Sequence, residues 1–577
     1  MCPCTKERFI KSCVENGSAI DVAYERCYRA GTFYSDVEEV GTLSEPAGNR
    51  EPDVDSAQPK ESQSSTGDPL TEDLLAKEWW DDADVDASSM AVSDALVVSI
   101  GGGLGSFALA DTLRVFGVST KDIVVVGDGD SPTRTYRYLA KNSQIPDAER
   151  LRSDAGSTMD NIWGFPSYAW REAIRERTIR PLLNVFGEPF SHDYYTPRAG
   201  HVYESVDKEA ERIGWKDMIQ PARVRLVRRR VGGGYFTVMT PLDSAVTGDG
   251  APLRKVIRSR HVHVAVGYPG VKFLGDLQAY RETYDERTRV VNAYEPHDQV
   301  YEECRRRPST VLVRGSGIVG SRILQRLLDD REHHGAETSV VHLFRNYVSE
   351  PQGDSALFRR PGKNGWAYQG FNFPKAAWGG QLKDKLESLD GPGRVELIRQ
   401  MGGTNTAPRQ SWKDQLERGR QQGWYREVIG SVQSVEPGPD QSIATTVKTK
   451  DGTVETLPAN FIIDATGLDA DITENRFLRD LLEKGGAGRS DFGRLDVSPA
   501  FEVLGTRSET GRLYASGSIT LGGYYAGVDS FLGLQYAALA IADDLAQAGE
   551  IPRLKALRST REWMRWLRSQ APKEVAA

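Results

Sequence analysis

The sequence predicts an α/β fold in which one strand–loop–helix unit occurs twice. An apolar strand, a glycine-rich loop and an apolar helix follow one another at residues 95–113 and again at residues 310–328. Alternating strand and helix patterns extend from residue 94 to about residue 548. The chain has 577 residues, of which 39% are hydrophobic and 27% charged, as expected for a soluble protein of several domains. These observations predict two Rossmann-like domains.

Four segments divide the chain. Residues 1–90 are expected to be an acidic, largely disordered extension with short helices, and residues 91–268 begin the first domain. Residues 269–466 are expected to form the second domain, with a helical insertion at about residues 351–436. Residues 467–577 return to the first domain and add C-terminal helices, so the second domain is inserted into the first.

The N-terminal extension differs from the rest of the chain in charge. It carries 20 Asp and Glu against 8 Lys and Arg, which leaves a net charge of about +4 for residues 91–577. Residues 70–82 predict one short acidic helix, which packs on its own domain or binds a protein partner. Four cysteines lie in this extension, at Cys2, Cys4, Cys13 and Cys27. Their spacing matches no zinc site, so we expect reduced thiols.

Several classes of protein are excluded by composition. No apolar run approaches the roughly 18 residues of a membrane span, and the N-terminus lacks the apolar stretch of a secretory signal. Lys and Arg form no dense stripe interleaved with aromatic residues, so nucleic acid is not an expected partner. A cytoplasmic enzyme is the expectation.

The first unit has the order typical of a dinucleotide-binding loop. The strand 95–100 leads into Gly101-Gly-Gly103-Leu-Gly-Ser106, and a helix follows. Gly101 allows a tight turn, Gly103 lets the backbone approach a pyrophosphate, and Ser106 is small enough for close packing of helix on strand. Asp128 ends the next strand, 25 residues after Gly103, where a carboxylate accepts a hydrogen bond from a ribose hydroxyl.

The second unit repeats this order. The strand 310–314 leads into a loop with Gly315, Gly317, Gly320 and Ser321, and a helix follows.

The strand after the second loop favours NADPH over NADH. It ends at Arg345, where an NAD-binding domain carries an acid. A guanidinium there pairs with a 2′-phosphate, unless Arg345 is an ordinary exposed residue at a strand end.

Two further strands end on small residues, as needed where backbone passes close to a dinucleotide. One, at residues 261–266, leads into Gly267, and the other, at residues 461–464, leads through Ala-Thr466 into Gly467. His261 and His263 alternate with valines, so we interpret them as side chains on strand faces and predict no metal site.

Two glycine-rich loops, each closed later by an Ala-Val-Gly or Ala-Thr-Gly strand, resemble flavoproteins with two dinucleotide-binding domains. The resemblance covers roughly residues 94–548 and implies FAD on the first loop and NADPH on the second. It also implies a return to the FAD domain, with Gly517, Ser518 and a helix beginning near Val528 at the flavin. The segment 161–166 is similar to the loop that lies against the isoalloxazine ring.

The candidate FAD-binding residues are Gly101, Gly103, Ser106, Asp128, Arg134, Trp163, Pro166, Gly267, Gly517, Ser518 and Val528. The candidate NADPH-binding residues are Gly315, Gly317, Gly320, Ser321, Arg345, Thr466 and Gly467.

Within this superfamily the chain is most similar to class B flavin monooxygenases, which include the flavin-containing, Baeyer–Villiger and N-hydroxylating types. Their aromatic–Gly–His–aromatic fingerprint precedes the second loop, and His297 and Tyr301 keep its spacing, although Val291 and Ala293 replace the expected Phe and Gly. The redox cysteine pair of a disulfide reductase is absent from the sequence. His297 and Tyr301 are the candidate catalytic side chains, because the flavin itself carries the chemistry.

The resemblance implies a monooxygenase that inserts one atom of O2 into a small-molecule substrate through a C4a-(hydro)peroxyflavin. Aromatic residues of the insertion, Trp366, Tyr368 and Trp378, line a substrate pocket or pack inserted helices. The alternative is an FAD-dependent NAD(P)H reductase or dehydrogenase without oxygen insertion. A third hypothesis is a redox-sensing or scaffolding flavoprotein whose N-terminal extension binds a partner.

Overall fold

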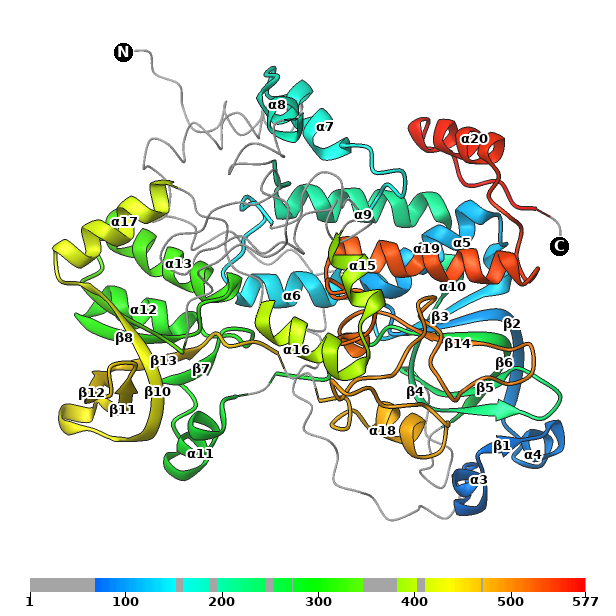
Figure 1. Cartoon of the computed structure of the whole chain (residues 1–577), viewed down its shortest axis with the longest axis horizontal. Coiled ribbons are helices and arrows are strands. Elements are labelled where there is room, and N and C mark those ends of the chain that lie inside the picture. The colour runs from blue at the N-terminus through cyan, green and yellow to red at the C-terminus, as the bar shows by residue number, and fades with distance from the viewer. Residues whose placement is uncertain are drawn as a thin grey trace, which may run out of the picture. The chain divides into compact units, whose positions relative to one another are not determined.

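The computed structural model describes residues 68–151, 159–186, 195–243, 253–271, 273–345, 381–401, 410–468 and 471–575. The predictions for residues 1–67, with their four cysteines, and for Trp366, Tyr368 and Trp378 lie outside the described residues. Two sheets organise the described chain (Figure 1), and the predicted α/β class is confirmed.

The first sheet has the strand order β1-β4-β3-β2-β6-β14, with β5 pairing with both β4 and β6. Its strands are β1 (Trp79–Trp80), β2 (Ala91–Ile100), β3 (Ile123–Gly127), β4 (Ile219–Arg230), β5 (Tyr235–Pro241), β6 (Lys255–Val264) and β14 (Leu513–Ala515). All pairs are parallel except those made by β5. The apolar runs of β2 and β3 are buried on both faces, as expected for central strands of a parallel sheet.

Helices cover both faces of the first sheet (Figure 1). On one face, α5 (Leu104–Phe116), α9 (Ala199–Ile213) and α19 (Phe531–Gln547) share a core that includes Phe107, Val206 and Ile541. On the other face, α18 (Arg476–Glu483) packs its apolar side against strands β2, β3 and β6.

The second sheet has the strand order β12-β11-β10-β9-β8-β13-β7. Its strands are β7 (Val290–Asn292), β8 (Ser309–Arg314), β9 (Thr338–Phe344), β10 (Tyr425–Pro437), β11 (Ile443–Thr449), β12 (Val454–Ala459) and β13 (Phe461–Asp464). Five neighbouring strands are parallel, namely β10, β9, β8, β13 and β7. Strands β11 and β12 add an antiparallel edge. One face packs on α12 (Asp298–Arg306) and α13 (Ile318–His334), and the other on α11 (Gly275–Tyr284) (Figure 1).

The remaining helices connect these layers. They are α3 (Glu72–Ala76), α4 (Asp82–Ala87), η1 (Thr120–Asp122), α6 (Arg134–Asn142), α7 (Ser167–Arg175), α8 (Arg180–Phe186), α10 (Trp215–Met218), α11 (Gly275–Tyr284), α12 (Asp298–Arg306), α13 (Ile318–His334), α15 (Gln381–Ser388), α16 (Gly391–Met401), α17 (Gln410–Gln421), η4 (Pro439–Gln441), η5 (Ser518–Thr520) and α20 (Ala556–Leu567). None of the helices in the described part combines the length and apolar character needed to cross a membrane.

The single helix predicted at residues 70–82 is wrong. Helix α3 ends at Ala76, and Trp79 and Trp80 form strand β1, which pairs in parallel with Arg229 and Arg230 of β4. The Trp80 side chain is fully buried, and its indole N–H donates to the Leu74 carbonyl at 3.0 Å. Burial of this large ring against the sheet outweighs the local helical pattern.

The helical insertion is shorter than predicted. Its described helices are α15, α16 and α17, the last of which ends at Gln421. From Tyr425 the chain forms β10, which pairs with β9 on one side and β11 on the other. Residues 425–436 therefore belong to the second sheet.

The chain returns to the first sheet after the second is complete. Leu513 to Ala515 of β14 pair with Val262 to Val264 of β6. Helix α19 begins at Phe531 rather than near Val528, because the Ser530 side chain caps it by accepting from the Gly533 N–H at 3.0 Å.

Candidate functional site

The turn that leaves β2 requires glycine at position 101. The Gly101 N–H donates to the Val126 carbonyl at 2.8 Å, and the residue has a φ of +136°. A Cβ at this position would lie 2.2 Å from the carbonyl oxygen of Ala265, the residue that directly follows β6. Only a residue without a side chain therefore fits this turn.

The next part of the loop is open. Gly103 is the N-cap of α5, and a Cβ at this position would meet no atom of the described chain within 4 Å. Ser106 is fully buried, and its hydroxyl accepts from the Gly102 N–H at 3.2 Å, which fixes the loop from inside. The N-terminus of α5 thus presents N–H groups and its positive dipole end to free space beside Gly103.

Two more predicted residues lie at the end of β3. The Asp128 side chain is exposed directly after this strand. Arg134, at the start of α6, donates to the Asp128 carbonyl oxygen at 2.6 Å. The parallel pairing of β2 and β3 places Asp128 at the same edge of the sheet as the glycine-rich loop.

The return segment brings a buried hydroxyl to this end of the sheet. Ser518 opens η5 directly after Gly517 and is 5% exposed, and its Oγ has no hydrogen-bond partner among the residues that the structure describes. Gly267 follows β6, and a Cβ at this position would have no atom of the described residues within 4 Å. Val528 is buried in the core shared with α5. An unsatisfied buried hydroxyl is costly, so Ser518 is suited to bind a polar group.

The segment predicted to lie against the flavin ring is held by the C-terminal helix. Pro166 is the N-cap residue of α7. The Trp163 indole N–H donates to Ser559 Oγ of α20 at 3.1 Å, and its ring centroid lies 6.1 Å from that of Trp566. Sequence reasoning missed this contact, because residues 163 and 559 are 396 positions apart and carry no shared motif.

The second loop repeats the turn of the first. The Gly315 N–H donates to the Leu343 carbonyl at 3.0 Å. With a φ of +120°, Gly315 leaves only 2.5 Å between a built Cβ and the Ala465 carbonyl oxygen. A Cβ at Gly320 would lie 2.4 Å from the Gly315 carbonyl oxygen, so helix α13 approaches the turn as closely as its backbone allows.

The other predicted residues of the second loop lie at its two ends. Gly317 is the N-cap of α13, and the buried Ser321 hydroxyl donates to the Ile318 carbonyl at 2.6 Å. The Thr466 hydroxyl donates to Asp464 Oδ1 at 2.6 Å, and a Cβ at Gly467 would meet no atom within 4 Å. Arg345 is exposed directly after β9, at the carboxyl edge of the second sheet.

His297 and Tyr301 contact each other. His297 Nε2 lies 2.9 Å from the Tyr301 hydroxyl, and its Nδ1 lies 2.7 Å from the Glu295 carbonyl oxygen. Burial lowers the pKa of His297 and raises that of Tyr301, so both are neutral near pH 7. Each ring nitrogen of His297 has a partner, an arrangement that positions strand β7 and helix α12. Their participation in catalysis stays a prediction.

The histidines of β6 face other side chains and backbone of the protein. His263 is buried between two hydroxyls, with Ser99 Oγ 2.9 Å from Nδ1 and Ser516 Oγ 2.8 Å from Nε2. Burial lowers its pKa to about 3, and the pKa of His261 to about 4. Across the described ranges, no group of three or more His, Cys, Asp or Glu side chains is arranged to hold a metal ion.

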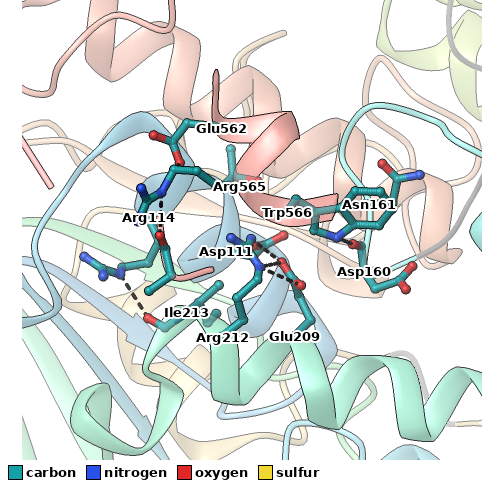
Figure 2. Close-up of polar contacts among 12 residues, drawn as sticks. Asp111, Arg114, Asp160, Asn161, Glu209, Arg212, Ile213, Glu562, Arg565 and Trp566 are labelled. Carbon is teal, nitrogen blue, oxygen red and sulfur yellow. Dashed lines mark hydrogen bonds and ion pairs between the residues drawn. The ribbon is translucent and has the colours of Figure 1, made fainter. Parts of the chain in front are cut away.

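A buried charge cluster, which no sequence motif predicts, joins α5 and α9 (Figure 2). Arg212 Nε donates to both carboxylate oxygens of Glu209, at 2.9 and 2.8 Å, and its Nη2 lies 3.4 Å from Asp111 Oδ1. All three side chains are buried. One arginine faces two carboxyls, and burial together with the charge of Glu209 raises the pKa of Asp111 well above its usual range. Burial and the nearby Glu209 carboxylate therefore favour the protonated form of Asp111.

The residues present fit two dinucleotides. Each loop combines a glycine turn packed against backbone with a helix N-terminus, and the first loop also has open space at Gly103 and the Ser518 hydroxyl, which has no partner among the described residues. These are the donors and the space that a pyrophosphate needs.

No family model matches the chain. A search of curated proteins likewise found no match. Solved structures do match. The ornithine hydroxylase PvdA from Pseudomonas aeruginosa is 14% identical, with a TM-score of 0.55 over 79% of this chain and 100% of that one. A Kutzneria sp. 744 ornithine N-hydroxylase, KtzI, with reduced FAD, NADP+ and L-ornithine, is 14% identical, with a TM-score of 0.56 over 79% and 100%.

A third solved structure agrees. The FAD-bound cadaverine monooxygenase DfoA from Erwinia amylovora is 13% identical, with a TM-score of 0.58 over 80% of this chain and 98% of that one. The chain therefore has the fold of these hydroxylases, and the predicted resemblance is confirmed at the level of the fold.

Proposed function

We propose that this chain is an FAD-dependent, NADPH-using monooxygenase. The observation that carries the proposal is the pair of glycine turns at Gly101 and Gly315, each packed against the backbone at the end of a neighbouring strand and each leading into a helix. The fold shared with PvdA, KtzI and DfoA supports it, because the KtzI structure holds both reduced FAD and NADP+. Fold alone does not fix function, so the site residues carry the argument.

We assign residues 91–268 and 467–577 to the FAD domain and residues 269–466 to the NADPH domain. Gly103 and the N-terminus of α5 would hold the FAD pyrophosphate, Asp128 the ribose, and Ser518 a polar group of the flavin side. Gly317 and the N-terminus of α13 would hold the pyrophosphate of NADPH, and Arg345 its 2′-phosphate.

The bound cofactors supply hydride transfer and oxygen chemistry that no side chain provides. The protein's own residues bind and orient them. Each of the two glycine turns leads the chain from its strand into a helix, and His263 of β6 links Ser99 of β2 with Ser516, the residue after β14, by hydrogen bonds at that end of the first sheet. No ionised side chain is needed as nucleophile.

The substrate class to test first is a small primary amine, because the three matching structures are named for ornithine and cadaverine hydroxylation. O2 would be the second substrate. We also place the enzyme in the cytoplasm, without nucleic acid as a partner. A protein partner for residues 1–67 stays a prediction.

Stopped-flow absorbance tests the proposal. The purified protein, loaded with FAD and reduced with NADPH, is mixed with aerated buffer with and without an amine. A monooxygenase should give a transient absorbing species that differs from both oxidised and reduced flavin, followed by hydroxylated product. Direct return to oxidised flavin without product would contradict the proposal and favour the reductase alternative.

A further inference from the structure

The C-terminal end of the described chain is fastened to the first domain by two buried arginines. Arg114 of α5 donates to Glu574 Oε1 at 2.8 Å, and Arg212 of α9 donates to the Gln570 carbonyl at 3.1 Å. The Val575 N–H also donates to the Gly117 carbonyl at 3.0 Å. We name helix α20 with residues 568–575 the C-terminal clasp.

The clasp is folded in its own right. Arg565 Nε donates to the Ala571 carbonyl at 2.8 Å, and the Lys573 N–H donates to Glu562 Oε2 at 3.3 Å. Glu562 is 3% exposed, although it lies on a surface helix. These bonds fold residues 568–575 back along α20, so the anchoring by Arg114 and Arg212 also fixes the helix.

The inner side of α20 contacts the loop of residues 160–165 (Figure 2). The Trp566 indole N–H donates to the Asp160 carbonyl at 2.6 Å. The Trp566 ring lies 6.1 Å from the ring of Trp163 and 6.2 Å, edge to face, from that of Phe165. About two turns earlier on the helix, Ser559 accepts the Trp163 indole N–H at 3.1 Å.

The other side of this loop contacts α19. Gln535 of α19 donates to the Asn161 carbonyl at 3.3 Å. Within the loop, Asn161 Nδ2 donates to the Phe165 carbonyl, and Asn161 Oδ1 accepts from the Trp163 N–H at 3.1 Å. The loop is therefore held between α19, from the segment that returns to the first sheet, and α20.

We propose that Trp566 is a positioning residue, which sets the 160–165 loop for the bound flavin through the Asp160 carbonyl and the rings of Trp163 and Phe165. This inference rests on the proposed function, and on the sequence resemblance that places segment 161–166 against the isoalloxazine ring. Trp566 itself acts through the loop and reaches the cofactor only by way of it. Ser559 has the same role through the Trp163 indole.

The contact chemistry makes Trp566 the main support. Its N–H bond to a carbonyl and its two aromatic contacts act on three residues of one short loop. Loss of one such bond with the ring retained should weaken FAD binding by about three- to ten-fold, since a ten-fold change in binding equals about 1.4 kcal/mol.

The test compares W566F and S559A with the full-length wild type. W566F keeps a ring but removes the N–H donor, and S559A removes the acceptor of the Trp163 indole. W563A is the matched control, because Trp563 lies on the same helix and makes no hydrogen bond or ring contact with residues 160–165 within the described chain. The readouts are the FAD dissociation constant, the visible circular dichroism of bound FAD and the thermal midpoint of the apoprotein.

W566F and S559A should each weaken FAD binding and change the flavin dichroism, with a wild-type thermal midpoint, whereas W563A should change neither flavin readout. If the wild type retains FAD and both variants give wild-type flavin spectra and affinity, the positioning role is wrong and the proposed function stands. Equal effects of W563A would also overturn it. A wild type that retains no FAD would overturn the proposed function and this inference together.

Discussion

The first loop requires glycine for two different reasons, one at Gly101 and the other at Gly103. A Cβ at this position would meet no protein atom within 4 Å, whereas one at Gly101 would lie 2.2 Å from a carbonyl oxygen. Gly101 therefore serves the fold, and Gly103 keeps space free for a ligand.

Replacing Gly103 with Val should lower bound flavin by more than about ten-fold with little change in stability, because the side chain takes the place of the pyrophosphate. Flavin absorbance after gel filtration, with a thermal midpoint, checks this. Gly275→Val is the matched control, since Gly275 also has open space around a built Cβ and opens a helix. Normal flavin content in Gly103→Val would remove FAD from the first loop.

The buried proton of Asp111 gives the first domain a pH dependence. The folded pKa of Asp111 is raised well above its unfolded value near 3.8, so the folded state holds a proton that the unfolded state releases. The free energy of unfolding should then fall as pH rises from about 4 to the folded pKa, by up to about 1.4 kcal/mol per pH unit for one proton.

Asp111→Asn mimics the protonated carboxyl and should remove this slope, so its stability relative to the wild type should grow with pH across the same window. Urea unfolding at a series of pH values measures the difference. Glu209→Gln should have a similar effect, because the pKa of Glu209 is also raised by burial and the two carboxyls share one arginine. Parallel stability curves for wild type and Asp111→Asn would show that no proton is held there.

Arg345 tests the choice of nicotinamide cofactor. Arg345→Ala should lower the preference for NADPH over NADH by about ten-fold or more, because a charge-assisted bond to the 2′-phosphate is lost. Reduction kinetics with both cofactors measure the ratio. Arg287→Ala is the charge-matched control, since Arg287 is exposed and precedes β7 at the opposite edge of the same sheet. A ratio unchanged in Arg345→Ala would mean that another residue reads the phosphate.

At the scale of elements, the strands that could be predicted from the sequence are those with continuous apolar runs. The strands at both loops were predicted because buried parallel strands read as continuous Val, Ile and Leu. Strand β10 was missed because only part of it is buried and its residues alternate in polarity. Strand β1 was missed because its partners, Arg229 and Arg230, lie 150 residues away in the sequence.

The two tryptophans of β1 give a prediction from adjacent positions. Trp80 is fully buried against the sheet, whereas Trp79 is 40% exposed and lies under the Arg229 guanidinium. Trp80→Ala should destabilise the protein by about 3–5 kcal/mol, because it leaves a cavity. Trp79→Ala should cost only about 0.5–1 kcal/mol, the size of an exposed cation–π contact. Chemical denaturation of both variants checks the difference, and similar losses would contradict the packing described here.

At the scale of the whole molecule, the residue at which the N-terminal extension ends decides which truncations keep the first domain stable. Leu74, Trp80 and Val85 belong to a core cluster with strands β4, β5 and β6. Deleting residues 1–67 removes none of that cluster and should preserve FAD content and turnover. Deleting residues 1–90 removes all three side chains and should destabilise the first domain. Turnover and thermal midpoints of the two truncations check this, and loss of flavin on removing residues 1–67 alone would show that the extension supports the enzyme.

Much of the candidate site was readable because it depends on short-range order. Glycine, strand and helix follow one another within a few residues, so both loops and Arg345 were predicted as single motifs. The long-range contacts that hold the site in place could not be predicted from the sequence. The Trp566 bond to Asp160 spans 406 positions, and the pairing of Asp111 with Arg212 spans 101. Such contacts depend on the finished tertiary structure and leave no local pattern.

Strand β14 is synthesised late in the chain, and this affects how the first sheet folds during translation. The second sheet is complete once Asp464 has been made, but β6 receives its last neighbour only when Leu513 emerges and pairs with Val262. At about 5–20 residues per second, translation leaves the edge of β6 open for tens of seconds. During that time an unpaired strand edge can recruit another chain. Residues Val262 to Val264 of β6 are the part of the edge left open, and we therefore expect fast overexpression to favour aggregates over soluble protein.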